Sequence, residues 1–229
     1  MLNDLRDLVM LLYGVPQRFI TVHLTLQTWY NPVLHGEAWE RWAALQPPGS
    51  VAQLRSASSM PLAKEAVQFW RQRLWLQPPD RWREEGENGM LTIVRERFRW
   101  LSGLPWKQGL EQEINPAQGW RSLLGDLALA EMLEPAALLP AVWLDLLGET
   151  HYAGRPAWQV RAVPREPGHP VFPHVLWLGA DEYELLVDSE RGVLLRCSAR
   201  FDGREFAGRE LLEVIFDEAF PDDLFRPRE

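Results

Sequence analysis

Side chains able to do acid–base, nucleophilic or metal-binding chemistry are few in this sequence, and their spacing does not join them. The five histidines are His23, His35, His151, His169 and His174. None belongs to a His-Glu-x-x-His pattern, and a single cysteine cannot complete a zinc site with them. His169 and His174 lie close together, but the two prolines between them are typical of a surface loop. The sequence therefore predicts no metal site.

Nucleophile and cofactor motifs lead to a similar prediction. Cys197 falls on the apolar side of an alternating segment, where we expect a small core residue rather than a nucleophile. No Gly-x-Ser-x-Gly elbow, Walker loop or Gly-x-Gly-x-x-Gly loop is present. The acidic pairs Glu84-Glu85 and Asp222-Asp223 are expected to be solvated carboxylates in turns or near the chain end. We expect a non-enzymatic protein with no catalytic residue and no cofactor.

The charge balance and hydropathy exclude two further classes of protein. The net charge is −8, which argues against a nucleic-acid partner because phosphate contact needs clustered Lys and Arg. Arg95, Arg97 and Arg99 alternate as they would on one solvated strand face. No apolar run approaches membrane-spanning length, so we expect no integral membrane segment.

The first residues bear on the cellular location. They carry Asp4 and Asp7 and lack the basic region and small-residue cleavage site of a signal peptide. As written, the sequence predicts a cytoplasmic protein. If a leader has been removed ahead of Met1, a periplasmic or cell-envelope location is expected instead.

Hydrophobic periodicity predicts helices and strands throughout the chain. The expected helices are 3–12, ended by Gly14, then 37–45, 120–133 and 135–139. The expected strands are 19–29, 69–76, 81–85, 90–100, 158–162, 175–178, 183–187, 193–201 and 212–216. Residues 46–64 and 101–119 are expected to be irregular. Consecutive strands joined by tight turns indicate an antiparallel sheet, so we expect an α+β fold in one domain spanning 1–229.

Several segments resemble the LolA/RseB-like superfamily of bacterial lipoprotein carriers and envelope-stress regulators. The carrying segments are Gly154–Val160, Tyr183–Arg196 with its Val-Asp-x-x-x-Gly hairpin, Phe220–Phe225, Leu74–Leu76 and Pro79–Glu84. The resemblance implies a strongly curved antiparallel sheet, an incomplete barrel whose concave apolar face is covered by helices. The helices expected at 37–45 and 120–139 are the candidates for that cover. Members of the superfamily hold acyl chains or apolar peptide segments in the concavity.

The expected function follows from this resemblance and from the apolar strand faces. The chain is expected to bind an apolar ligand, which would be a lipid, an acyl chain or a lipoprotein-like segment. The alternative is a regulatory or interaction module that binds a protein segment with its concave face or sheet edge. The positions expected to line the apolar cavity are Leu24, Leu26, Trp70, Leu74 and Trp177. Most of the twelve Trp residues are expected simply to fill the core.

Overall fold

The fold was determined from a computed structural model that describes residues 5–14, 19–47, 66–103, 106–114, 126–165 and 173–227. The strands are β1 (Val22–Tyr30), β2 (Gln68–Gln77), β3 (Arg81–Gly86), β4 (Leu91–Arg95), β5 (Phe98–Gly103), β6 (Trp106–Glu113), β7 (Val142–Tyr152), β8 (Arg155–Pro164), β9 (Glu182–Asp188), β10 (Leu194–Phe201) and β11 (Arg204–Phe216). The helices are α1 (Leu5–Tyr13), α2 (Pro32–Ala44) and α5 (Leu127–Leu133), with 3₁₀ turns η2 (Pro135–Leu138) and η3 (Asp222–Phe225).

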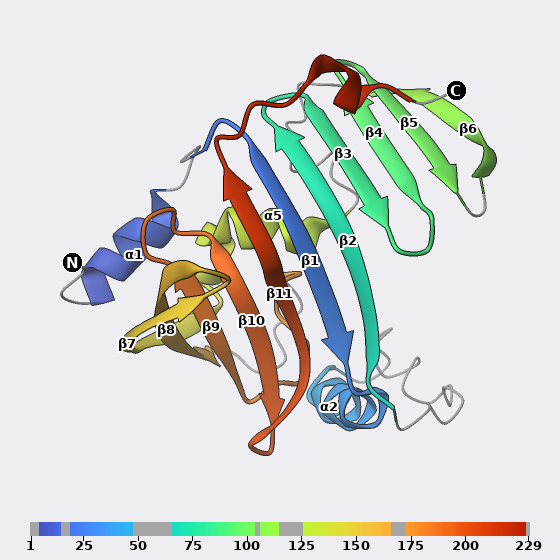
Figure 1. Cartoon of the computed structure of the whole chain (residues 1–229). Helices are drawn as coiled ribbons and strands as arrows, with labels where there is room; N and C mark the ends of the chain where they lie inside the picture. The colour runs from blue at the N-terminus through green and yellow to red at the C-terminus, as the bar shows by residue number, and fades with distance from the viewer. Residues whose placement is uncertain are drawn as a thin grey trace. The chain divides into compact units, whose positions relative to one another are not determined.

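All eleven described strands belong to one sheet, in the order β6-β5-β4-β3-β2-β1-β11-β10-β9-β8-β7 (Figure 1). The pairs whose register is known are antiparallel. The sheet is not closed into a barrel, because the two end strands β6 and β7 are not paired with each other. The α+β class with an open antiparallel sheet is therefore confirmed.

The described structure divides into two compact units, and β1, β2 and β11 contribute residues to both. The first unit holds α1, α2, η2, β7 to β10 and most of α5. The second unit holds β3 to β6 and η3, with most of β2. The single domain over 1–229 stays a prediction.

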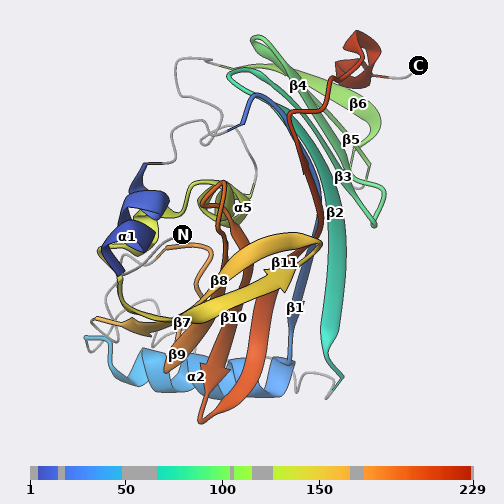
Figure 2. The same cartoon turned by 60° about the vertical axis from the view of Figure 1, so that its left-hand side comes forward.

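In the first unit, strand alternation separates an apolar face from a charged one. Val160 lies opposite Leu185, which lies opposite Cys197, and all three side chains are fully buried. Apolar side chains of α1, α2 and α5 complete this core (Figure 2). They include Leu8, Leu12, Ala38, Leu129, Met132 and Leu133. At about 25 cal/mol per Å² of buried apolar area, this layer supplies the main stabilisation of the unit.

In the second unit, β2 to β6 form a meander with its own core. Leu76, Trp82 and Val94 face one another across β2, β3 and β4, and none has exposed surface. On the opposite face, the Arg83 guanidinium donates to the Leu224 carbonyl of η3 at 3.0 Å. The C-terminal turn is thereby fastened to the sheet of its own unit.

The first of the differences from the sequence prediction lies at Asn31-Pro32, between the strand expected at 19–29 and the helix expected at 37–45. Asn31 caps α2, since its side-chain oxygen accepts from the backbone N–H groups of Val33 at 3.0 Å and Leu34 at 3.2 Å. Pro32 suits the first helical position, where no N–H partner is needed. The helix therefore begins five residues before the expected Glu37.

Further differences concern the middle of the chain. The single strand expected at 90–100 is the hairpin β4–β5, because Glu96 turns the chain with a φ of 58°. Part of the segment expected to be irregular forms β5 and β6. Strand β7 was not expected at all, whereas the strand expected at 175–178 is irregular chain. Only α5 and η2 represent the helices expected at 120–139, and residues 115–125 lie outside the described part of the chain, as do the loop residues 48–64.

One buried ion pair joins two of the segments that carry the family resemblance, Gly154–Val160 and Tyr183–Arg196. Asp188 has no exposed side-chain surface and accepts a hydrogen bond from the Arg155 guanidinium. Its other oxygen accepts from the backbone N–H groups of Glu190 at 2.9 Å and Arg191 at 2.7 Å. Asp188 therefore shapes the β9–β10 turn and fixes the start of β8 with a single carboxylate.

We expect Asp188→Ala to lower the free energy of unfolding by about 3 kcal/mol. The change removes the buried carboxylate that pairs with Arg155 and accepts hydrogen bonds from two turn N–H groups. Urea denaturation would measure this. Glu190→Ala is the matched control, since Glu190 is 63% exposed and pairs with the same arginine. Its expected cost is below about 1 kcal/mol. Equal losses for the two variants would contradict the assigned role of Asp188.

Candidate functional site

An apolar pocket lies in the first unit, where the C-terminal end of α2 meets the end of β8 and the chain entering β9. Its volume is about 130 Å³. The lining residues are Arg41, Trp42, Leu45, Val163, Pro164, Leu178, Gly179, Ala180, Asp181 and Tyr183. Most are apolar, and the charged pair Arg41 and Asp181 supplies polar atoms. We call this the α2 pocket.

The floor of the α2 pocket depends on a direct backbone contact between Gly179 and α2. A β-carbon added to Gly179 would lie 2.0 Å from the carbonyl oxygen of Ala38, and Gly179 has a φ of 83°. Only glycine suits this place, because it combines left-handed backbone with a missing side chain. The close approach sets the spacing between the helix and the 178–181 segment.

Arg41 ties the same segment to the helix. Its guanidinium pairs with Asp181, lies 3.3 Å from the Asp202 carboxylate and donates to the Gly179 carbonyl at 3.3 Å. It also stacks over the Phe201 ring at 4.0 Å from the centroid. Because these groups surround the cation, it holds the pocket wall in place.

An aromatic cluster adjoins the pocket along the chain. Trp177 packs against Tyr30 at 6.1 Å and His35 at 5.4 Å between ring centroids, with the Arg209 guanidinium 4.7 Å from its ring. The Tyr183 hydroxyl donates to the Trp177 carbonyl at 2.6 Å. Burial lowers the pKa of His35, which favours its neutral form. The cluster is therefore a packed anchor for the segment that leads to the α2 pocket.

The five residues expected to line a cavity do not gather at this pocket. Leu24, Leu26 and Leu74 are buried core residues of the second unit. Trp70 is 39% exposed in the same unit, while Trp177 belongs to the first. None of the five lines the α2 pocket, and their role in ligand binding stays a prediction.

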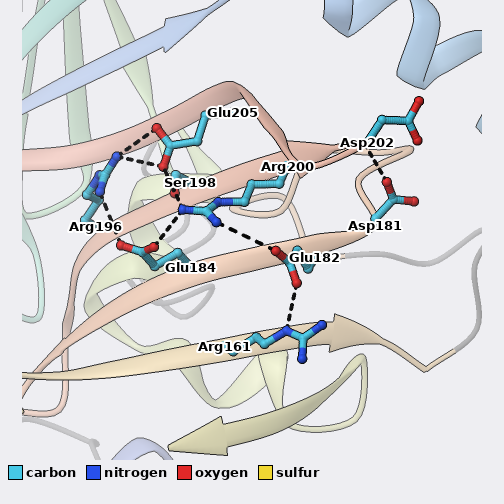
Figure 3. A network of polar contacts seen from close by, with 9 residues as sticks. All are labelled: Arg161, Asp181, Glu182, Glu184, Arg196, Ser198, Arg200, Asp202 and Glu205. Carbon is cyan, nitrogen blue, oxygen red and sulfur yellow. Dashed lines mark hydrogen bonds and ion pairs between the residues drawn. The ribbon is translucent and has the colours of Figure 1, made fainter. Parts of the chain in front are cut away.

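The charged face of the first unit carries an ion-pair network that spans β8 to β11 (Figure 3). Arg200 lies 3.0 Å from Glu184, and Arg196 lies 3.2 Å from Glu205. Arg161 extends the network to Glu182 at 2.7 Å. Since cations and carboxylates alternate between neighbouring strands, the network cross-links the four strands. These charges are compensated within the face itself.

The titratable groups of the described residues offer little for catalysis. Cys197 is fully buried and burial raises the pKa of its thiol to about 12, which disfavours the reactive thiolate. No group of three or more possible metal ligands occurs in the described ranges. His23 stacks on Trp75 at 4.8 Å and His174 lies 3.2 Å from Glu131, whereas His169 falls outside the described residues.

Glu84 departs from the sequence prediction. It lies in strand β3, where a strand was expected at 81–85, but directly opposite the buried Leu74 and not as a solvated turn carboxylate. Its pKa is raised to about 7, mainly by burial and also by the nearby Asp126, while Arg99 acts in the opposite direction. Gln72 donates to Asp126 at 3.2 Å in the same unit. A carboxyl on the apolar side of a strand is the signal that could have revealed this group, because Trp82 and Glu84 share one face.

Sequence reasoning also missed the α2 pocket. Its residues come from three separate segments, so no spacing along the chain connects them. The one local indication in the sequence was Gly179, because a glycine often stands where two backbones approach closely.

Comparisons with known proteins place this chain by fold. The structure of MucB alone matches with 17% identity and a TM-score of 0.53, over 97% of this chain and 62% of that chain. MucB in complex with MucA(peri) matches with 18% identity and a TM-score of 0.52, over 98% and 60%. The MucA/MucB complex of Pseudomonas aeruginosa matches with 18% identity and a TM-score of 0.50, over 98% and 59%.

These matches confirm that the fold is LolA/RseB-like. The chain spans about 60% of the length of the MucB chains it matches. No protein-family model matches the sequence, and no curated protein matches it. Within the described residues, no helix has the length and apolar character needed to cross a membrane.

We expect Gly179→Ala to destabilise the protein by about 2 kcal/mol or more, since the added carbon meets the α2 backbone and the φ is positive. Thermal and urea unfolding would measure the loss. Gly36→Ala in α2 is the control, because an added carbon there meets nothing within 4 Å. It should be neutral or stabilising by up to about 1 kcal/mol. A Gly179→Ala protein as stable as Gly36→Ala would refute the close contact.

The raised pKa of Glu84 predicts a pH-dependent stability. The folded state holds the proton more tightly than the unfolded chain, so the stabilisation is complete below about pH 4.5 and is lost as the pH rises to about 7. Glu84→Gln should remove roughly 2–3 kcal/mol of this pH dependence. Urea unfolding at pH 5 and pH 8 would measure it. Glu111→Gln, at an exposed position, should keep the wild-type profile; if Glu84→Gln keeps it too, the carboxyl is not perturbed.

Proposed function

We propose that this chain is a non-enzymatic binding protein that holds an apolar group of its ligand in the α2 pocket. The observation that carries the proposal is the pocket itself, an apolar hollow of about 130 Å³ with a fixed charged wall. Filling it would remove apolar surface from water, at a gain of about 25 cal/mol per Å². The MucB complexes with MucA support a binding role for a chain of this fold.

The size of the α2 pocket favours one ligand class over another. A dry cavity of about 150 Å³ accommodates a molecule the size of benzene, whereas pockets for whole small ligands run from about 300 to 1,000 Å³. A volume of about 130 Å³ therefore suits one side chain of a polypeptide better than a whole acyl chain. The protein-segment alternative gains support from this comparison, with Arg41 and Asp181 available to its polar groups.

An acyl chain or lipid is the second candidate function. It would need a longer apolar channel, and the predicted cavity residues Leu24, Leu26, Trp70, Leu74 and Trp177 are the positions proposed to form it. Three of these have 1% exposure or less, so a lipid would have to displace core packing to reach them. In such a carrier, the compartment would be the periplasm or cell envelope.

The test compares capped nonapeptides that carry a central Leu or a central Ser with palmitate as the acyl probe. We expect the Leu peptide to bind more tightly than the Ser peptide. Leu45→Asn should weaken the Leu peptide about three- to tenfold, because it removes apolar surface from the pocket wall. Isothermal titration calorimetry would give the affinities.

Ile20→Asn is the matched control for this test. Ile20 is 75% exposed and does not line the α2 pocket, so its replacement should leave the peptide affinity unchanged. Two outcomes would overturn the peptide proposal. One is an equal effect of Leu45→Asn and Ile20→Asn. The other is stoichiometric palmitate binding, insensitive to Leu45→Asn, with no binding of the Leu peptide.

A further inference from the structure

A second hollow lies in the first unit, beside the end strand of the sheet. Strand β7 pairs with β8 on one side, and among the described strands no other pairs with it (Figure 2). The hollow has a volume of about 430 Å³. It is lined by Glu149, Thr150, His151, Pro156, Ala157, Trp158 and Ser189. We call this the β7 hollow.

The end strand has two stretches of different character. The register with β8 shifts between Leu146 and Gly148, where a bulge interrupts the ladder. Bulges of this kind protect an edge against unwanted pairing, which is the purely structural explanation for this strand. Beyond the bulge, however, Gly148–Tyr152 pairs regularly with Arg155–Gln159. This second stretch borders the hollow, and among the described strands only β8 pairs with it.

The side chains of the β7 hollow define the chemistry it would accept. Glu149 is exposed and lies directly opposite Trp158, whose side chain is 6% exposed, so the Glu149 carboxylate is the accessible group of this pair. A carboxylate attracts a cation and accepts charge-assisted hydrogen bonds from it. No Lys or Arg lines the hollow. The complementary group is therefore the side chain of a lysine or an arginine.

We infer that the Gly148–Tyr152 edge and the β7 hollow together bind an extended polypeptide segment that carries a basic side chain. Such a segment would add a strand to β7, with main-chain hydrogen bonds providing affinity and the hollow selecting one side chain. A volume of about 430 Å³ is large enough for a whole side chain, within the usual range of ligand pockets. A second copy of the chain pairing through the same stretch would not supply the cation, because Gly148–Tyr152 contains no Lys or Arg.

This site is separate from the α2 pocket in residues and in chemistry. The two share no lining residue, and the α2 pocket carries the Arg41–Asp181 ion pair where the β7 hollow carries Glu149. The inference therefore does not rest on the function proposed above.

The test uses three capped, fluorescently labelled octapeptides. One alternates Val and Lys, one alternates Val and Glu, and one is the Val/Lys peptide with N-methylated backbone. Fluorescence anisotropy should show tighter binding of the Val/Lys peptide than of the other two. Hydrogen exchange should slow at the Gly148–Tyr152 amides when that peptide is bound. Glu149→Lys should weaken the Val/Lys peptide by about tenfold or more, because like charges then meet, and should improve binding of the Val/Glu peptide.

Glu111→Lys is the matched control, since it makes the same charge change at an exposed position of β6. It should leave the affinity unchanged. The inference is overturned if no peptide binds, if the two charge reversals have equal effects, or if exchange slows elsewhere in the sheet. A doubled mass of the peptide-free protein that Glu149→Lys abolishes would also overturn it, because the edge would then serve a second copy.

Discussion

The first unit depends on the buried contact between Arg155 and Asp188. The Asp188 carboxylate holds the β9–β10 turn through two backbone N–H groups, and it neutralises the arginine that begins β8. Burying an aspartate carboxylate costs free energy unless a cation and hydrogen-bond donors compensate its charge. Here the Asp188 oxygens accept hydrogen bonds from three donors, one of them the Arg155 guanidinium. Because β8, β9 and β10 are thereby fixed in register, the apolar and charged faces of the sheet are fixed as well.

The two faces then serve different purposes. The charged face cross-links β8 to β11 through Arg161, Arg196 and Arg200, whose partners lie on neighbouring strands. The apolar face receives helices, and the approach of Gly179 to the α2 backbone leaves the pocket beside Trp42 and Leu45. The proposed binding function uses this division, because the pocket is apolar and Arg41 holds its charged wall.

Much of the fold could be predicted from local signals. The alternation around Cys197 predicted a buried cysteine, and Asp188 to Gly192 predicted the β9–β10 turn; both predictions are confirmed. Other elements escaped because the local signal was ambiguous. Asn31-Pro32 can end a strand or begin a helix, and the capping hydrogen bonds decide for the helix. Strand β7 escaped because its bulge at Leu146–Gly148 breaks the alternation.

The sequence by itself determined the class of fold, because strand periodicity, tight turns and capping residues act between near neighbours in the chain. It also determined the motifs around Arg155 and Asp188, although not that the two side chains meet. Only the tertiary structure decided the sites. The α2 pocket joins three separate segments, the β7 hollow is lined by residues of β7, β8 and the β9–β10 turn, and burial raises the pKa of Glu84. Each depends on distances and on exclusion of water, which arise only when remote segments pack together.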